Sequence, residues 1–193
     1  MEEKMLSNGN FSLEYETERL ILRVLTPEYA NEVAAFQADN RTIFEKYEPS
    51  RPEDFYTPEH QQLILKAEFN QALRMSTIRY YVFLKSNPWS IIGTVCLHDI
   101  RRLSYSCCEI GYKFDSKFTG NGYAREAVDS LVTIAFGSLK IHRVFARVMP
   151  ENAPSIKLLQ ALNFISEGTE YKSLHINGTW EDHLRFAKLN PQE

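Results

Sequence analysis

The sequence predicts a mixed α/β (α+β) domain, in which helices flank a mostly antiparallel sheet with one parallel strand pair. Three strand-like runs between residues 80 and 114 follow one another across short turns, which is typical of an antiparallel meander. The last run leads through a helix to a strand at residues 143–148, and this strand–helix–strand order implies parallel pairing. Asn177-Gly178, between two further strand-like runs, predicts a terminal hairpin.

Composition excludes several classes of function. With 193 residues, of which 44% are hydrophobic and 24% charged, the chain fits one globular domain with a full core. The formal net charge is −3 and no basic run occurs, so we expect no nucleic-acid partner. No apolar run has the length of a signal peptide or a membrane span, so we expect a cytoplasmic protein with no membrane partner. Cys96, Cys107 and Cys108 show neither disulfide nor metal-ligand spacing, and we expect no metal.

The chain is expected to begin with a leader. Residues 1–16 show no periodicity and should form a loose segment, whereas residues 17–189 should form the domain. The first strand is expected at residues 19–24. A Thr-Pro-Glu signal begins at Thr26 and again at Thr57, and it combines an N-cap, a proline at the first helical position and a first-turn acid. The domain should therefore open with a strand and two helices.

The second of these helices should be the longer one. It is expected to run to about Met75 and to carry Leu63, Ile64 and Ala67 on one apolar face. Between the two helices, residues 39–56 carry several aromatic side chains but show no period. We expect a loop with short helical turns there.

The strongest functional signal is the glycine pair that follows the meander. The chain reads as a strand up to Phe114. From about Tyr123 apolar residues recur at helical spacing, so Gly120 and Gly122 lie where the strand gives way to a helix; the apolar residues are Ala127, Val128, Leu131, Ile134 and Ala135. Glycine lets the backbone approach a ligand, and the first N–H groups of a helix have no intrahelical partner. The pair therefore predicts an anion site, and phosphate suits it. A dinucleotide fingerprint would need Gly or Ala at Arg125, and a P-loop would need Gly-Lys-Ser/Thr, so neither motif is present.

The longer run Gly120-Asn121-Gly122-Tyr123-Ala124-Arg125-Glu126-Ala127 resembles the Gly-x-Gly-Tyr-Ala-x-Glu-Ala of RimJ/RimL-type GNAT acetyltransferases, which acetylate protein N-termini. The shorter GNAT pattern is Gln/Arg-x-x-Gly-x-Gly/Ala, and this chain has Lys117 at its first position. The order of expected elements is similar to the GNAT fold over nearly the whole chain. The resemblance implies acetyl-CoA as co-substrate, no metal, and a parallel strand pair that splays apart to admit the thioester arm.

The same resemblance implies which residues hold the coenzyme. Main-chain groups at the end of the meander would bond the pantetheine arm, the glycine loop would hold the pyrophosphate, and a second loop would face the thioester. The coenzyme-binding residues implied in this way are Tyr112, Lys113, Phe114, Lys117, Gly120, Asn121, Gly122, Tyr123, Ala124 and Asn152.

Attack of an amine on a thioester needs a neutral amine and a proton for the departing thiolate. In the resembled branch, the Glu of Glu-Ile-Gly-Tyr is taken as the base, directly or through water, and here it is Glu109. The alternative is that Glu109 is a surface or ion-paired glutamate on a strand, without a role in catalysis. Ser155, in an Asn-x-x-Ser pattern with Asn152, would be the acid toward sulfur. The alternative is that Asn152 caps a helix and Ser155 bonds back to its first turn.

The acceptor is less defined by the sequence. The resemblance implies the α-amine of a protein N-terminus, but a small amine such as a polyamine, amino acid or aminoglycoside is an alternative, as is a non-catalytic acyl-CoA sensor. The aromatic residues of the loop at 39–56 would contact the acceptor or simply pack beneath that loop. Tyr112 is a second candidate for carrying the proton, and the scattered histidines are interpreted as structural. A monomer and a homodimer are both compatible with the sequence.

Overall fold

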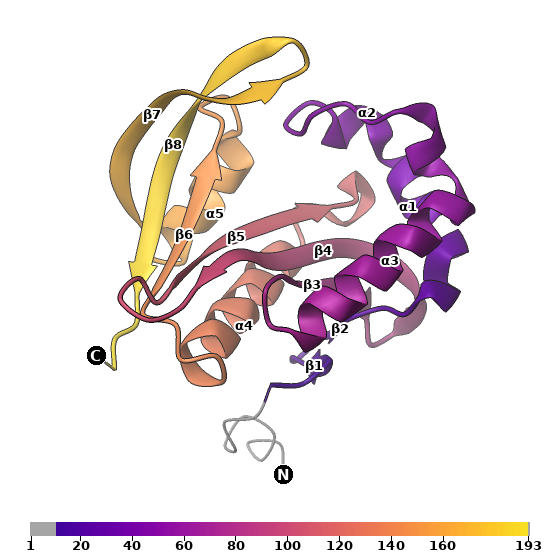
Figure 1. Ribbon diagram of the computed structural model, residues 1–193, viewed down its shortest axis with the longest axis horizontal. Helices are drawn as coiled ribbons and strands as arrows, with labels where there is room; N and C mark the ends of the chain where they lie inside the picture. The colour runs from indigo at the N-terminus through magenta and orange to yellow at the C-terminus, as the bar shows by residue number, and fades with distance from the viewer. Residues whose placement is uncertain (1–10, 193) are drawn as a thin grey trace.

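The computed structural model describes residues 11–192, and its strands form one eight-stranded sheet in the order β1-β2-β3-β4-β5-β6-β8-β7 (Figure 1). Neighbouring strands run antiparallel except β5 and β6, which run parallel. The predicted meander, parallel pair and terminal hairpin are therefore confirmed. The strands are β1 (Glu14–Glu16), β2 (Leu20–Arg23), β3 (Ile78–Leu84), β4 (Asn87–Arg101), β5 (Cys107–Phe114), β6 (Arg143–Val148), β7 (Ile165–Ile176) and β8 (Thr179–Leu189).

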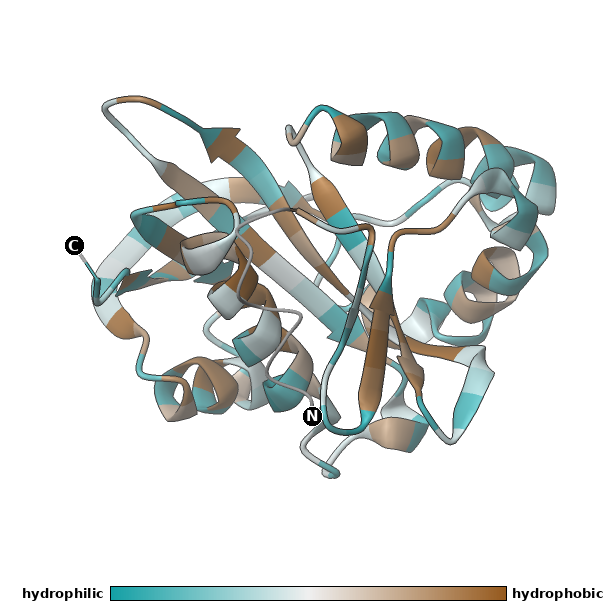
Figure 2. Ribbon diagram, turned by 90° about the horizontal axis from the view of Figure 1, so that it is seen from below, coloured by the Kyte–Doolittle hydropathy of each residue, from teal (hydrophilic) through white to brown (hydrophobic). Residues whose placement is uncertain are grey.

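Helices cover both faces of this sheet. The helices α1, α2 and α3 lie together on one side, and α4 and α5 pack on the other (Figure 1). Figure 2 shows helices that carry hydrophobic and hydrophilic residues in alternation, as expected when one face packs on the sheet. The α-helices are α1 (Ala30–Asp39), α2 (Arg41–Phe44), α3 (Pro58–Leu73), α4 (Tyr123–Gly137) and α5 (Ala153–Ala161), and the 3-10 turns are η1 (Pro27–Tyr29), η2 (Glu53–Tyr56) and η3 (Ser116–Phe118).

The main core lies between α4 and the central strands. The five apolar residues predicted at helical spacing after Tyr123 are all buried on one face of α4, which confirms the predicted helix. They are Ala127, Val128, Leu131, Ile134 and Ala135. A smaller apolar cluster lies on the opposite side of the sheet, beneath α1 and α3. No helix in the described part of the chain is long and apolar enough to cross a membrane.

The parallel pair of strands separates after a short contact. Pairing runs from Cys107 opposite Arg143 to Glu109 opposite Phe145, whereas β5 continues to Phe114 and β6 to Val148. The β6 strand remains paired with β8 along its whole length, so β5 and β6 diverge without leaving the sheet. The fold thus opens a gap between the carboxyl ends of two parallel strands, the usual place for a ligand in an α/β sheet.

Two expectations were wrong. The proposed leader is too long, because residues 14–16 form β1, which pairs with β2 and buries Tyr15. Residues 1–10 lie outside the described residues. The packed face of α3 is also different: Leu63 is 69% exposed, and the buried residues of this helix are Gln61, Leu65 and Ala72. Gln61 lies inside because its side-chain amide donates to a backbone carbonyl oxygen of the preceding loop.

Candidate active site

The connection from β5 to α4 presents a row of unpaired backbone N–H groups. Gly120 and Gly122 have left-handed φ angles of 81° and 79°, which glycine adopts without steric cost. Within residues 11–192, no backbone N–H of residues 120–124 donates to a protein acceptor. Since these groups stand at the positive end of the α4 dipole, the loop is built to bind an anion.

Arg19, the residue before β2, holds this loop from the side. Its Nε donates to Glu126 at 2.7 Å, its Nη1 donates to the carbonyl oxygen of Asn121 at 3.0 Å, and its guanidinium lies over the Tyr123 ring. Glu126 also accepts from the Thr17 hydroxyl and from the backbone N–H of Arg19. The glutamate of the glycine motif therefore serves to fix the loop against the first strands of the sheet.

A cavity of about 380 Å³ fills the gap between β5 and β6, and we call it the splay cleft. Thr119 and Ala124, which flank the glycine loop, form part of its wall, so the cleft reaches the unpaired N–H groups. The structure brings together here half of the expected site residues, namely Tyr112, Lys113, Phe114, Ala124, Asn152 and Ser155. The other half are not part of this wall: Glu109, Lys117, Gly120, Asn121, Gly122 and Tyr123.

Asn152 and Ser155 have separate functions in the structure. Asn152 caps α5, because its side-chain oxygen accepts from the backbone N–H of Ser155 at 3.2 Å. The Ser155 hydroxyl does not bond back to the helix but lies beside the Tyr112 hydroxyl. Burial raises the pKa of Tyr112 to about 12, and a hydrogen bond with the Ser155 side chain opposes that rise in part. The capping alternative thus accounts for Asn152 but not for the Ser155 side chain, which lines the splay cleft next to Tyr112.

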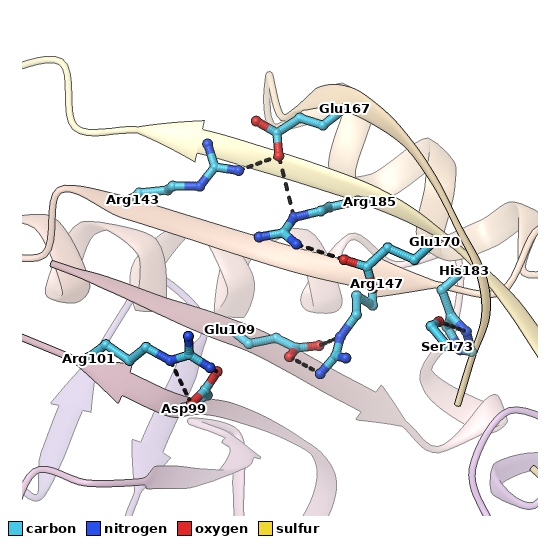
Figure 3. A network of polar contacts seen from close by, with 10 residues as sticks. All are labelled: Asp99, Arg101, Glu109, Arg143, Arg147, Glu167, Glu170, Ser173, His183 and Arg185. Atoms are coloured by element: carbon cyan, nitrogen blue, oxygen red, sulfur yellow. Dashed lines mark hydrogen bonds and ion pairs between the residues drawn. The ribbon is translucent and has the colours of Figure 1, made fainter. Parts of the chain in front are cut away.

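Glu109 is ion-paired. Figure 3 shows Arg147 reaching from β6 toward the carboxylate on β5, at the point where the strands separate. Arg147 donates from Nε to Oε1 at 3.0 Å and from Nη2 to Oε2 at 2.5 Å, and Glu109 is only 6% exposed. The hydrogen bonds that Arg147 donates to Glu109 raise the pKa of Arg147. Both carboxylate oxygens of Glu109 are therefore already engaged by a cation.

A second cavity, also about 380 Å³, lies on the α3 side of the sheet, and we call it the side cavity. Gly111, Tyr112 and Lys113 line both cavities, so β5 is the partition between them. Its charged wall residues include two internally paired carboxylates: Glu48 accepts from Lys113 Nζ at 2.8 Å, and Glu68 accepts from Arg79 Nε at 2.7 Å.

His98 lies in the wall of the side cavity next to the partition. It stands opposite Glu109 in the β4–β5 ladder, and a Cβ added to Gly111 would lie 3.6 Å from its Nε2. The ring therefore covers a stretch of β5 that has no side chain of its own. Burial lowers the pKa of His98, and the Glu109 charge opposes that shift in part.

Three functional residues were not identified from the sequence. Arg147 could have been found from strand alternation, since it follows Phe145 by two residues and so shares the face of Glu109. Arg19 carries no local signal, because its contacts lie about a hundred residues away along the chain. His183 lines the splay cleft, is buried, and has its Nδ1 3.3 Å from the Ser173 hydroxyl (Figure 3). The same Nδ1 lies 3.3 Å from the Glu181 carbonyl oxygen.

The cysteines are poor candidates for the chemistry of this site, although Cys96 is a wall residue of the side cavity. Cys96, Cys107 and Cys108 are buried free thiols, and burial raises the pKa of Cys96 and that of Cys108, the latter to about 12. A thiol held protonated in this way is a poor nucleophile. Among residues 11–192, no group of three or more His, Cys, Asp or Glu side chains could hold a metal ion.

The site combines a pair of splayed strands with a glycine loop at the start of a helix, and this combination defines an acyl-CoA-type transferase site. Comparison with known proteins agrees with this class. Residues 19–165 match the acetyltransferase (GNAT) domain family, and the chain belongs to this family. It is 36% identical to a probable N-acetyltransferase of Bacillus subtilis, over 90% of this chain and 96% of the relative. It is 30% identical to the ribosomal protein uS5-alanine N-acetyltransferase of Escherichia coli, over 91% of this chain and 90% of the relative.

Solved structures give the same result. The ribosomal-protein-S5-alanine acetyltransferase of Vibrio fischeri superimposes with a TM-score of 0.87 at 32% identity, covering 93% of this chain and 98% of that one. The predicted GNAT fold is therefore confirmed, and the protein is an N-acetyltransferase.

Proposed function

We propose that this protein transfers an acetyl group from acetyl-CoA to the α-amine of a protein N-terminus. The observation that carries the proposal is the row of unpaired N–H groups at residues 120–124, which opens onto the splay cleft. A diphosphate fits this row, because several N–H donors and a helix dipole converge where no side chain intervenes. Acetyl-CoA, when bound, supplies the thioester carbon that the amine attacks.

The remaining coenzyme contacts follow from the wall of the cleft. The unpaired outer edge of β5 at Tyr112, Lys113 and Phe114 offers main-chain groups to the pantetheine arm, and Gly120 to Ala124 receive the pyrophosphate. The Ser155 hydroxyl, next to Tyr112 in the wall of the cleft, then faces the sulfur as a hydrogen-bond donor to the developing thiolate. Glu109 assists removal of the amine's proton indirectly, through a second group, because Arg147 already occupies both of its carboxylate oxygens.

The side cavity supports a protein N-terminus over a small polycation as the acceptor. Its two carboxylates, Glu48 and Glu68, are each paired with a cation, and Arg51 adds a further positive charge to the wall. A polyamine would gain little from such a cavity, because no carboxylate is left uncompensated to attract it. A polar cavity with balanced charges instead suits the peptide groups and the side chain of an N-terminal residue. The Escherichia coli relative, by its name, acts on an alanine of a ribosomal protein.

Thiol release from acetyl-CoA, measured with a panel of acceptors, tests the proposal. The panel includes short peptides that begin with Ala or Ser, the same peptides with a blocked α-amine, spermidine and free amino acids. We expect release with the free peptides alone, and mass spectrometry should place the acetyl group on the α-nitrogen. Release with spermidine but no peptide would move the acceptor to a small amine, and tight CoA binding without release from any acceptor would favour a sensor.

Ser155→Ala should slow turnover without weakening coenzyme binding. We expect kcat to fall about 10-fold, the value of one hydrogen bond to a developing charge, while the dissociation constant for CoA changes less than about 2-fold. Steady-state kinetics and calorimetry measure the two quantities. Ser166→Ala on the exposed face of β7 is the matched control.

Asn152→Ala separates capping from catalysis in the same helix. It should lower stability by about 1 kcal/mol through loss of the cap, whereas Ser155→Ala should leave the melting temperature unchanged. Wild-type kinetics in Ser155→Ala would show that this hydroxyl takes no part in the reaction.

A further inference from the structure

We infer that His98 is the group that takes the proton from the acceptor's ammonium, and that Glu109 acts through His98. The inference rests on the proposed function, in that it assumes an amine acceptor entering from the side cavity. His98 then takes the place of the water molecule that would otherwise have to link the Glu109 carboxylate to the amine.

The position of His98 supports this assignment. Its ring covers Gly111, and Gly111 belongs to the walls of both the side cavity and the splay cleft. A Cβ at residue 111 would lie 3.6 Å from Nε2, in van der Waals contact with the ring, so the imidazole lies directly beside this stretch of β5. An amine in the side cavity that approaches β5 at Gly111 would therefore lie next to the imidazole.

Hydrogen bonding distinguishes His98 from Glu109. Arg147 donates to both oxygens of Glu109, and the side chain of Glu109 is 8% exposed. The His98 ring makes no hydrogen bond within residues 11–192, although it lies in a polar cavity wall. A ring nitrogen is thus available to a new partner, and the carboxylate is not.

The charges around His98 suit a base that works near neutral pH. Glu109 and Asp99 favour the imidazolium, Arg79 and Arg147 oppose it, and burial is the largest influence and lowers the pKa of His98. Burial therefore favours the neutral imidazole, which can accept a proton, and the carboxylate of Glu109 lies across the ladder to stabilise the cation that forms.

The proton balance of the step is complete. The ammonium of the acceptor gives one proton to His98, and the neutral nitrogen forms a bond to the thioester carbonyl carbon. The carbon–sulfur bond breaks with its electron pair on sulfur, and the second proton of the attacking nitrogen passes to the thiolate with the help of Ser155. His98 returns its proton to solvent, so the products are the amide, the free thiol and one released proton.

His183 is the competing imidazole, because it lines the splay cleft. Its Nδ1 already has two neighbours, the Ser173 hydroxyl and the Glu181 carbonyl oxygen, and it is not a wall residue of the side cavity. We therefore assign the proton to His98, and the comparison of the two variants decides between them.

The test is the pH profile of kcat/KM for His98→Asn with the preferred acceptor of the wild-type protein. At pH 7 an α-amine is about 10% neutral, so loss of the base should cost about 10- to 30-fold. The penalty should shrink below about 3-fold at pH 9, where the amine is mostly neutral. In His98→Ala, added imidazole should restore activity at pH 7. His142→Asn, before the opposite end of β6, is the matched control and should keep the wild-type profile.

Three outcomes would overturn the inference. They are an unchanged profile in His98→Asn, a pH-independent loss without imidazole rescue, and a profile that shifts in His183→Asn but not in His98→Asn. If the wild-type protein acetylates only small amines, the proposed peptide acceptor fails, and the same variants still test His98 with that amine.

A readout independent of turnover is the NMR titration of the His98 ring. We expect its pKa below the ordinary value near 6.5 in the wild-type protein, and lower still in Glu109→Gln, because the carboxylate that favours the imidazolium is removed. A His98 that titrates above 7, or that is insensitive to Glu109→Gln, would refute the coupling even if no acceptor were acetylated.

Discussion

Gly122→Val is expected to weaken coenzyme binding strongly. Gly122 precedes α4 with φ of 79°, and a β-branched residue in this region costs about 1 to 3 kcal/mol. The added Cβ would also lie 3.4 Å from Nη2 of Arg19, the side chain that fixes the loop. Relief of the backbone strain turns the N–H groups away from one another. We expect the affinity for CoA, measured by calorimetry, to fall about 100-fold, or ~2.7 kcal/mol.

Two controls make this result specific to the diphosphate. Gly168→Val places the same residue at another positive φ, in β7 and in open space, and should leave CoA affinity unchanged. S-acetylpantetheine lacks the diphosphate, so its slow turnover should be equal in the wild-type protein and in Gly122→Val. An unaltered affinity for CoA in a folded Gly122→Val protein would show that the loop does not hold the coenzyme, and the proposed function would lose its main support.

The fold could be predicted because its determinants are local. The Asn-Gly hairpin, the proline helix start at Thr57 and the α4 stripe are each written within a few residues, and each is present in the structure. At Thr26 the same signal begins a 3-10 turn without a side-chain cap, and α1 follows from Ala30. The glycine loop is also local, since a strand end, two glycines and a helix start determine its conformation. The packed face of α3 was missed because Gln61 is buried through a hydrogen bond to the loop before it, which hydrophobicity alone does not predict.

The electrostatics of the site could not be predicted in the same way. Glu109 was recognised as a candidate, but its partner Arg147 lies on β6, and the bidentate contact depends on where the two strands stop pairing. His98 lies opposite Glu109 only through the register of β4 against β5, which contains an irregularity just beyond that pair. Arg19 supports the glycine loop from the opposite end of the chain. Such contacts follow from the assembled sheet, and no local sequence pattern encodes them.

Glu109→Gln is expected to lower kcat/KM about 100-fold at pH 7, which corresponds to ~2.7 kcal/mol of lost transition-state stabilisation. The substitution removes the charge that stabilises a His98 imidazolium and leaves Arg147 without its counter-charge beside the incoming ammonium. Both effects oppose deprotonation, so activity should recover as pH rises and the acceptor becomes neutral. Glu167→Gln, which removes a carboxylate from the Arg143 and Arg185 contacts instead, is the matched control.

A double-mutant cycle with His98→Asn determines how Glu109 acts. If Glu109 works through the imidazole, His98→Asn should cost less than about 3-fold once Gln occupies position 109, because the group that Glu109 supports no longer matters. Multiplicative losses would mean that the two residues act independently, with the carboxylate contacting the amine itself after Arg147 moves away. Full activity of Glu109→Gln at neutral pH would remove Glu109 from the reaction altogether and leave the ion pair as a structural link between the two diverging strands.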